Sequence, residues 1–193
     1  MKVYFDVLHL YYLPQYLPVY EQLVQSGAQA CFVFYQQQTP ELIAATEQAI
    51  SDAQLPAQWL DNDNQALEFY QRSDADWVIF GKAFAQMQQL NQHKKTVLMQ
   101  HGIGPKSCYY DASNNAASVR FVEGQHRLER LARLYPKSHF IDTGYAKLDP
   151  LLKPQPYGAS GAINHASLGL NPNKPTLLYA PTFYPSSIEM MAK

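Results

Sequence analysis

Between residues 1 and 150 the chain alternates short apolar runs with segments of helical spacing, and this alternation constrains its fold most strongly. Residues 28–35 form an almost unbroken apolar run, which is typical of a strand covered on both faces. No Asn-Gly type of turn joins neighbouring runs as a hairpin would, so we expect parallel strands. Strands are expected over 2–8, 28–35, 58–60, 76–80, 95–101, 118–122 and 139–142, and helices over 16–26, 40–53, 63–72, 84–90 and 125–134. The pattern predicts an α/β fold with a Rossmann-like, doubly wound parallel sheet.

The composition changes after this alternating region. Residues 153–161 are rich in Pro, Gly and Ser, which is typical of a linker. We therefore expect an N-terminal domain over 1–152, a linker over 153–175, and the first strand and loop of a truncated second domain over 176–193. A lone strand over 176–180 needs partners for its backbone, so the rest of that domain would lie outside this chain. The alternative is that this strand docks on the edge of the first sheet.

Composition and charge exclude several classes of protein. Hydrophobic residues make up 47% of the chain and charged residues 16%, as in a folded globular protein. A net charge of -1 argues against a nucleic-acid binder driven by bulk charge. Only Cys31 and Cys108 are present, without metal-ligand spacing, so we expect no disulfide framework and no metal. Without a signal peptide or a membrane-spanning run, the protein is expected to be cytoplasmic, with contact to the inner face of the membrane left open.

His101 stands where a strand run ends and a loop with two glycines begins. The carboxyl ends of strands in open α/β sheets carry ligand sites, and histidine accepts a proton near neutral pH. Gly102 and Gly104 would let the backbone approach a ligand, and Lys106 would meet an anion. The alternative for His101 is a neutral imidazole with a purely structural hydrogen bond.

Two other groups of residues carry weaker signals. His9 also follows a strand and could face the same cleft as His101, although packing among neighbouring tyrosines is the favoured interpretation. Arg127, Arg130 and Arg133 recur at helical spacing and could form a basic strip for an anionic acceptor or a lipid surface. Pairs of Glu and Arg four residues apart favour a solvated helix face instead.

Three blocks in order carry a resemblance to a known family: Gln-His-Gly at 100–102, Gly-Tyr-Ala-Lys-Leu-Asp at 144–149, and Leu-Tyr-Ala-Pro-Thr at 178–182. This arrangement resembles the CDP-glycerol glycerophosphotransferases of teichoic-acid-type polymer synthesis and, more broadly, glycosyltransferases of the two-domain GT-B architecture. The resemblance covers the amino-terminal half of such an enzyme and the first strand of the other half. The chain departs from the family pattern at Ala146-Lys147 and at Phe183-Tyr184.

The resemblance implies a reaction and a division of roles. Glycerol phosphate would pass from CDP-glycerol, or another nucleotide-activated donor, to a hydroxyl of a cell-envelope polymer or lipid-linked acceptor, with release of CMP and without a cofactor. His101 matches the family's general base. Gly102, Gly104, Lys106 and His9 on the acceptor side, and Pro181 and Thr182 after the linker, are expected to contact substrate. The donor nucleotide would be bound by the second domain, so the 193-residue chain alone is expected to be inactive.

The sequence is also compatible with other functions. A GT-B sugar transferase or a nucleotide-sugar epimerase relative acting on a UDP-sugar would share the two-domain plan. A non-catalytic binding module that holds an acceptor or a partner is the alternative of a different class. A dehydrogenase lacks its Gly-x-Gly-x-x-Gly sequence after the first strand, and an α/β-hydrolase lacks its Gly-x-Ser-x-Gly turn.

Overall fold

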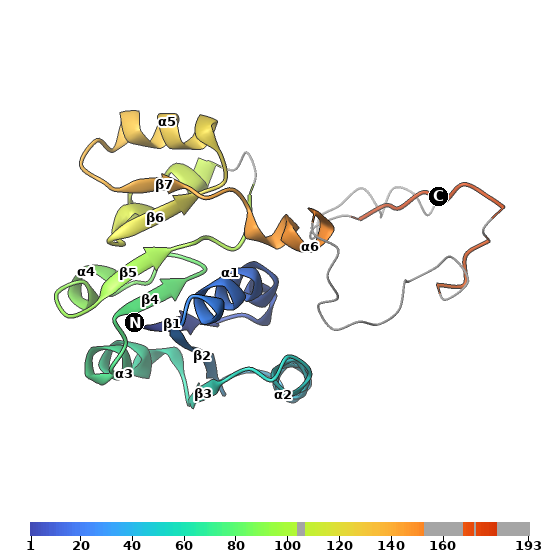
Figure 1. Cartoon of the computed structure of the whole chain (residues 1–193), viewed down its shortest axis with the longest axis horizontal. Coiled ribbons are helices and arrows are strands. Elements are labelled where there is room, and N and C mark those ends of the chain that lie inside the picture. The colour runs from blue at the N-terminus through green and yellow to red at the C-terminus, as the bar shows by residue number, and fades with distance from the viewer. Residues whose placement is uncertain (104–106, 153–167, 172, 181–193) are drawn as a thin grey trace. The chain divides into compact units, whose positions relative to one another are not determined.

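A parallel sheet forms the centre of the larger of two units. The computed structural model describes residues 1–103, 107–152, 168–171 and 173–180, and the chain divides into two compact units, Met1–Gly158 and Ala159–Lys193. The first unit holds a seven-stranded sheet in the order β3-β2-β1-β4-β5-β6-β7, with every neighbouring pair parallel (Figure 1). The strands are β1 (Lys2–Asp6), β2 (Gln29–Tyr35), β3 (Ala57–Leu60), β4 (Trp77–Phe80), β5 (Lys95–Leu98), β6 (Val119–Val122) and β7 (Phe140–Asp142).

The strand order reverses direction at the middle of the sheet. From β1 the chain builds outward to β2 and β3, and then returns to place β4 on the other side of β1. The crevice outside the carboxyl ends of β1 and β4 is where open α/β sheets bind their ligands. The predicted α/β class and parallel sheet are confirmed, and the order is consistent with a Rossmann-like fold.

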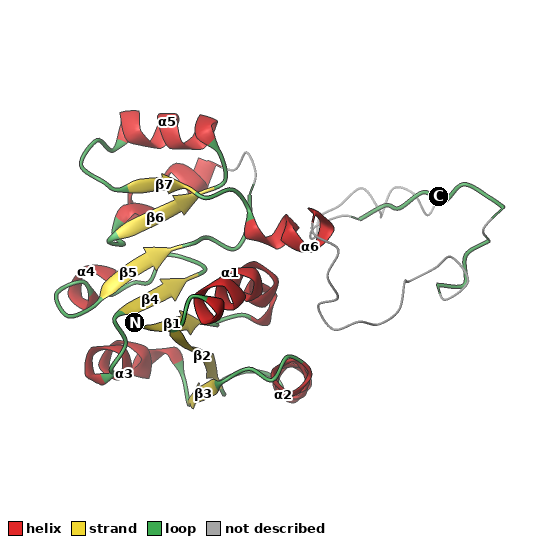
Figure 2. Ribbon diagram, viewed as in Figure 1, coloured by secondary structure: helices red, strands yellow, loops and turns green. Residues whose placement is uncertain are grey.

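Helices cover both faces of the sheet (Figure 2). Helices α1 (Leu13–Gln25) and α2 (Pro40–Asp52) pack on the face to which Val3 and Phe5 point. Helices α3 (Ala66–Arg72) and α4 (Met87–Leu90) pack on the face to which Tyr4 points. Because successive side chains of a strand point to opposite faces, one apolar strand such as β1 supplies both cores. The other elements are α5 (Gln125–Leu134), α6 (Asp149–Leu152) and the 3₁₀ turns η1 (Leu10–Tyr12), η2 (Asp63–Gln65), η3 (Ser107–Tyr110), η4 (Ala112–Asn115) and η5 (Ala146–Leu148).

The sequence predicted the start of α2 and both ends of α5 correctly. The Thr39 side chain accepts a hydrogen bond from the Leu42 backbone N–H at 3.4 Å, and Pro40 is the first residue of α2. Both residue types favour a helix N-terminus, and the predicted start of this helix at residue 40 is confirmed. Helix α5 has the predicted bounds, 125–134.

Several boundaries differ from the predictions by one to three residues, and two of these differences have a clear cause. Strand β5 ends at Leu98 and not at His101, because Gln100 adopts a φ of 63° and turns the chain out of the sheet. Helix α1 begins at Leu13 and not at residue 16. Its first turn accommodates Pro14, since the backbone N–H that proline lacks has no intrahelical acceptor there.

The second unit is described only at 168–171 and 173–180. No helix or strand occurs within these residues, and Leu177 and Leu178 are 89% and 84% exposed. Within the described residues, 176–180 are therefore not paired as the predicted strand. The linker and the second domain stay predictions, since 153–167 and 181–193 lie outside the described residues. None of the described helices is long and apolar enough to cross a membrane.

Candidate functional site

The carboxyl edge of the sheet brings both predicted histidines together. His9 follows β1, Gly81 follows β4 and His101 follows β5, so residues far apart in the sequence meet beside the point where the strand order reverses. His101 Nδ1 lies 2.8 Å from the Gly81 carbonyl oxygen, a contact between residues 20 positions apart.

Aromatic rings enclose the two histidines. The His101 ring stacks on Tyr12, with centroids 5.1 Å apart and planes at 21°, and its edge meets Tyr11 at 5.3 Å. The His9 ring stacks on Tyr11 at 5.2 Å and 10°. We call His9, Tyr11, Tyr12 and His101 the histidine–tyrosine cluster. His9 therefore packs among tyrosines, as the favoured interpretation predicted. It also lies near His101, because both histidines contact Tyr11.

The contact with Gly81 determines which ring nitrogen of His101 carries the proton. A carbonyl oxygen can only accept a hydrogen bond, so Nδ1 carries the proton and Nε2 of the neutral ring retains its lone pair. His9 has a lowered pKa, chiefly because it is partly buried and also because Lys82 and His101 lie nearby. His9 is therefore largely neutral at neutral pH, and His101 presents a proton-accepting atom.

Gly81 permits this packing because it has no side chain. A Cβ at this position would lie 2.5 Å from Cδ2 of the fully buried Tyr12 ring. Only glycine lets β4 end this close to the ring on which His101 stacks.

A buried arginine fixes the loop that carries His101. Arg120, in β6, is 1% exposed. Its guanidinium donates to Gln100 Oε1 at 2.9 Å, to the Tyr109 carbonyl oxygen at 2.6 Å and to Asn115 Oδ1 at 2.8 Å. Burial lowers the pKa of Arg120 to about 10, which leaves it charged at neutral pH. Arg120 thus ties Gln100, next to His101, and the η3 turn to the sheet.

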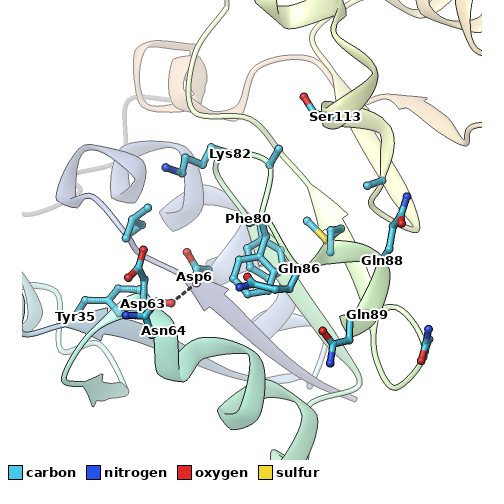
Figure 3. Close-up of a pocket in the computed structure, with 17 residues that line it drawn as sticks. Asp6, Tyr35, Asp63, Asn64, Phe80, Lys82, Gln86, Gln88, Gln89 and Ser113 are labelled. Carbon is cyan, nitrogen blue, oxygen red and sulfur yellow. Dashed lines mark hydrogen bonds between the residues drawn. The ribbon is translucent and has the colours of Figure 1, made fainter.

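A cleft of about 1050 Å³ opens at the same edge, over the ends of β1, β2 and β4 (Figure 3). Asp6 lies at its base and is 6% exposed. Its Oδ2 accepts hydrogen bonds from the hydroxyls of Tyr35 and of Tyr70, the latter at 2.9 Å. Burial raises the pKa of Asp6 to about 6, although both tyrosines and the charge of Lys82 oppose that shift.

The structure describes three of the predicted site residues and leaves the other four outside its described ranges. His101, His9 and Gly102 lie at the carboxyl edge, and the Tyr109 hydroxyl would be 3.3 Å from a Cβ on Gly102. Four predicted contacts, Gly104, Lys106, Pro181 and Thr182, lie outside the described residues. Within the residues that are described, no group of three or more His, Cys, Asp or Glu side chains is placed to hold a metal ion.

Sequence reasoning missed several residues of this edge. Asp6 ends the apolar first strand, so the reasoning that selected His101 could also have selected it. Arg120 interrupts an apolar strand with a charge, which is a second readable signal. The contact between Gly81 and Tyr12 has no signal in the sequence, since nothing local relates the two residues.

The arginines of α5 depart in part from the predicted solvated face. Arg127 is 7% exposed, lies 2.5 Å from Glu123 through its Nε, and sits over the rings of Tyr109 and Tyr110. The prediction was wrong for Arg127, because the aromatic segment after β5 covers it. Arg130 is exposed and lies 4.0 Å from the Tyr110 ring centroid.

Neither models of known protein families nor curated protein sequences match this chain.

Proposed function

We propose that this chain is the acceptor side of a GT-B-type transferase that moves glycerol phosphate from CDP-glycerol to a hydroxyl of a cell-envelope polymer or lipid-linked acceptor. The supporting observation is the hydrogen bond between His101 Nδ1 and the Gly81 carbonyl oxygen, beside a cleft at the carboxyl edge. It leaves Nε2 as a base held in one orientation, as general-base catalysis requires.

In this proposal the acceptor hydroxyl attacks the phosphorus that carries the glycerol. The P–O bond to CMP breaks, CMP leaves, and the hydroxyl proton passes to His101 Nε2 and then to solvent. The Gly81 carbonyl oxygen stabilises the imidazolium through Nδ1–H, in the way a carboxylate or carbonyl orients a catalytic histidine. Tyr12 holds the ring plane by stacking, which limits the orientations that the base can adopt.

The remaining parts of the proposal come from the sequence resemblance alone. One is a second domain that binds the donor, and another is the contact of Lys106, Pro181 and Thr182 with substrate. The third is transfer to a lipid-linked acceptor at the inner face of the membrane. These parts can be tested only in the intact protein that carries this chain.

The test replaces His101 by asparagine in the intact protein. The Asn amide can still donate to the Gly81 carbonyl oxygen but has no base at the Nε2 position. We expect the turnover of CDP-glycerol, measured as CMP release in the presence of acceptor, to fall by about two to four orders of magnitude. The KM for the acceptor should change by less than about threefold, because the substitution removes an interaction of the transition state.

His93→Asn is the matched control, because His93 is exposed and lies outside the histidine–tyrosine cluster. It should retain normal turnover. Normal turnover of a folded His101→Asn protein would refute the assignment of the base. Turnover of a UDP-sugar in place of CDP-glycerol would favour the sugar-transferase alternative.

A further inference from the structure

The cleft beside the histidine–tyrosine cluster carries chemistry that the proposed base does not use. Neither His9 nor His101 lines it. In Figure 3, Asp6, Tyr35, Asp63 and Asn64 lie on one side and Gln88 and Gln89 on the other, with Lys82 above. Its volume of about 1050 Å³ is at the upper end of the range for small-molecule sites, so it has room for more than one ring of a ligand.

The charges of the cleft disfavour an anionic ligand. Among the described residues that line the cleft, the carboxyl groups of Asp6 and Asp63 face one cation, Lys82. A phosphate placed inside would meet two like charges for one opposite charge. Lys82 lies at the boundary, since its charge acts on both Asp6 in the cleft and His9 in the histidine–tyrosine cluster.

The uncharged polar groups of the cleft match hydroxyl groups. Most are amides, which both donate and accept hydrogen bonds, as a hydroxyl does: Asn64, Gln86, Gln88, Gln89 and Gln92. The Asp6 carboxyl is already bonded by two tyrosine hydroxyls and by the Leu8 backbone, so the amides are the main partners offered to ligand hydroxyls.

An aromatic wall completes the cleft. The ring of Phe84, which lines it, stacks on the buried Phe80 with centroids 5.1 Å apart and planes at 15°. The stack fixes the orientation of the Phe84 ring. A rigid aromatic ring beside several amides suits a molecule with one apolar C–H face and hydroxyls around its rim, which is the character of a sugar ring.

We infer that this cleft binds an uncharged, hydroxyl-rich sugar moiety, held by the amide and carboxyl groups against Phe84. The inference rests on the proposed function in one respect: that function identifies the bound sugar as the end of the acceptor nearest to His101. Phosphate groups of the same acceptor would then lie outside the cleft, on the side of Lys82.

The test measures binding to the 193-residue chain by NMR titration, with cellobiose and chitobiose as neutral probes and α-glycerophosphate and CMP as anionic probes. We expect the disaccharides to shift the resonances of Asn64, Phe84 and Gln89 with a Kd on the order of 1 mM. The anionic probes should bind these residues at least about tenfold more weakly.

Variants of exposed glutamines test the contacts without disturbing the core. Gln86 and Gln89 are both exposed, so the double variant Gln86→Ala/Gln89→Ala should fold normally and weaken disaccharide binding by about five- to tenfold. Gln48→Ala, an exposed position in α2 that does not line the cleft, should bind as the wild type does.

Three outcomes would overturn the inference: no shift with either disaccharide, unchanged binding by the double variant, or tighter binding of CMP or α-glycerophosphate at these residues. His101→Asn should bind the disaccharides normally. Binding without any effect of His101→Asn on transfer would reject the proposed function alone, and transfer without disaccharide binding would reject this inference alone.

Discussion

The buried carboxyl of Asp6 makes the stability of this fold dependent on pH in an unusual direction. Asp6 is 6% exposed, and its pKa is raised from 3.8 to about 6, mainly by burial. The folded protein therefore holds a proton on Asp6 over a pH range in which the unfolded chain has released it. Stability from this group is fully present below pH 3.8 and is lost as the pH rises through about 6.

The size of the effect follows from the shift in pKa. At about 1.36 kcal/mol per pKa unit, the full shift corresponds to roughly 3 kcal/mol of unfolding free energy. Between about pH 5 and about pH 8 the loss is roughly 1.4 kcal/mol, because the unfolded chain has already released most of this proton at the lower pH and the rest of the full effect is lost below it.

The assay compares urea unfolding of the wild type and Asp6→Asn at these two pH values. Asparagine keeps an oxygen that can accept from Tyr35 and Tyr70 but cannot titrate. The unfolding free energy of the wild type minus that of the variant should decrease by roughly 1.4 kcal/mol from the lower to the higher pH. Asp111→Asn controls for the loss of one exposed negative charge and should not reproduce this change. A difference that stays constant, or grows toward high pH, would refute the reasoning.

Three further substitutions test the packing. Gly81→Ala places a Cβ 2.5 Å from the Tyr12 ring and should cost about 1–3 kcal/mol in thermal unfolding; an unchanged Tm would contradict this close contact. Arg120→Lys keeps a buried charge but cannot span three acceptors, so chemical denaturation should show a loss of about 2–3 kcal/mol. Thr39→Ala removes the cap of α2 and should cost about 1 kcal/mol, while Thr39→Ser should retain most of that stability; equal losses in both variants would argue against capping.

The sequence by itself determined the elements and their class. The bounds of α5 and the start of α2 at Pro40 follow from apolar spacing and capping residues, which act over one or two turns of the chain. The alternation of strands and helices without hairpins was enough to predict parallel strands, because such strands need crossovers. The position of His101 near a carboxyl end was readable for the same local reason, although β5 ends three residues before it, at Leu98.

Only the tertiary structure decided what His101 touches. The hydrogen bond to Gly81 and the stack on Tyr12 depend on which strands become neighbours, and strand order is a property of the whole sheet. The same holds for Asp6, whose carboxyl accepts a hydrogen bond from Tyr70, 64 positions away. Local patterning reports which face of an element is apolar, but it carries no information about which distant side chain will meet that face. The base orientation and the cleft therefore emerge from long-range packing, while the elements that carry them were readable from the chain alone.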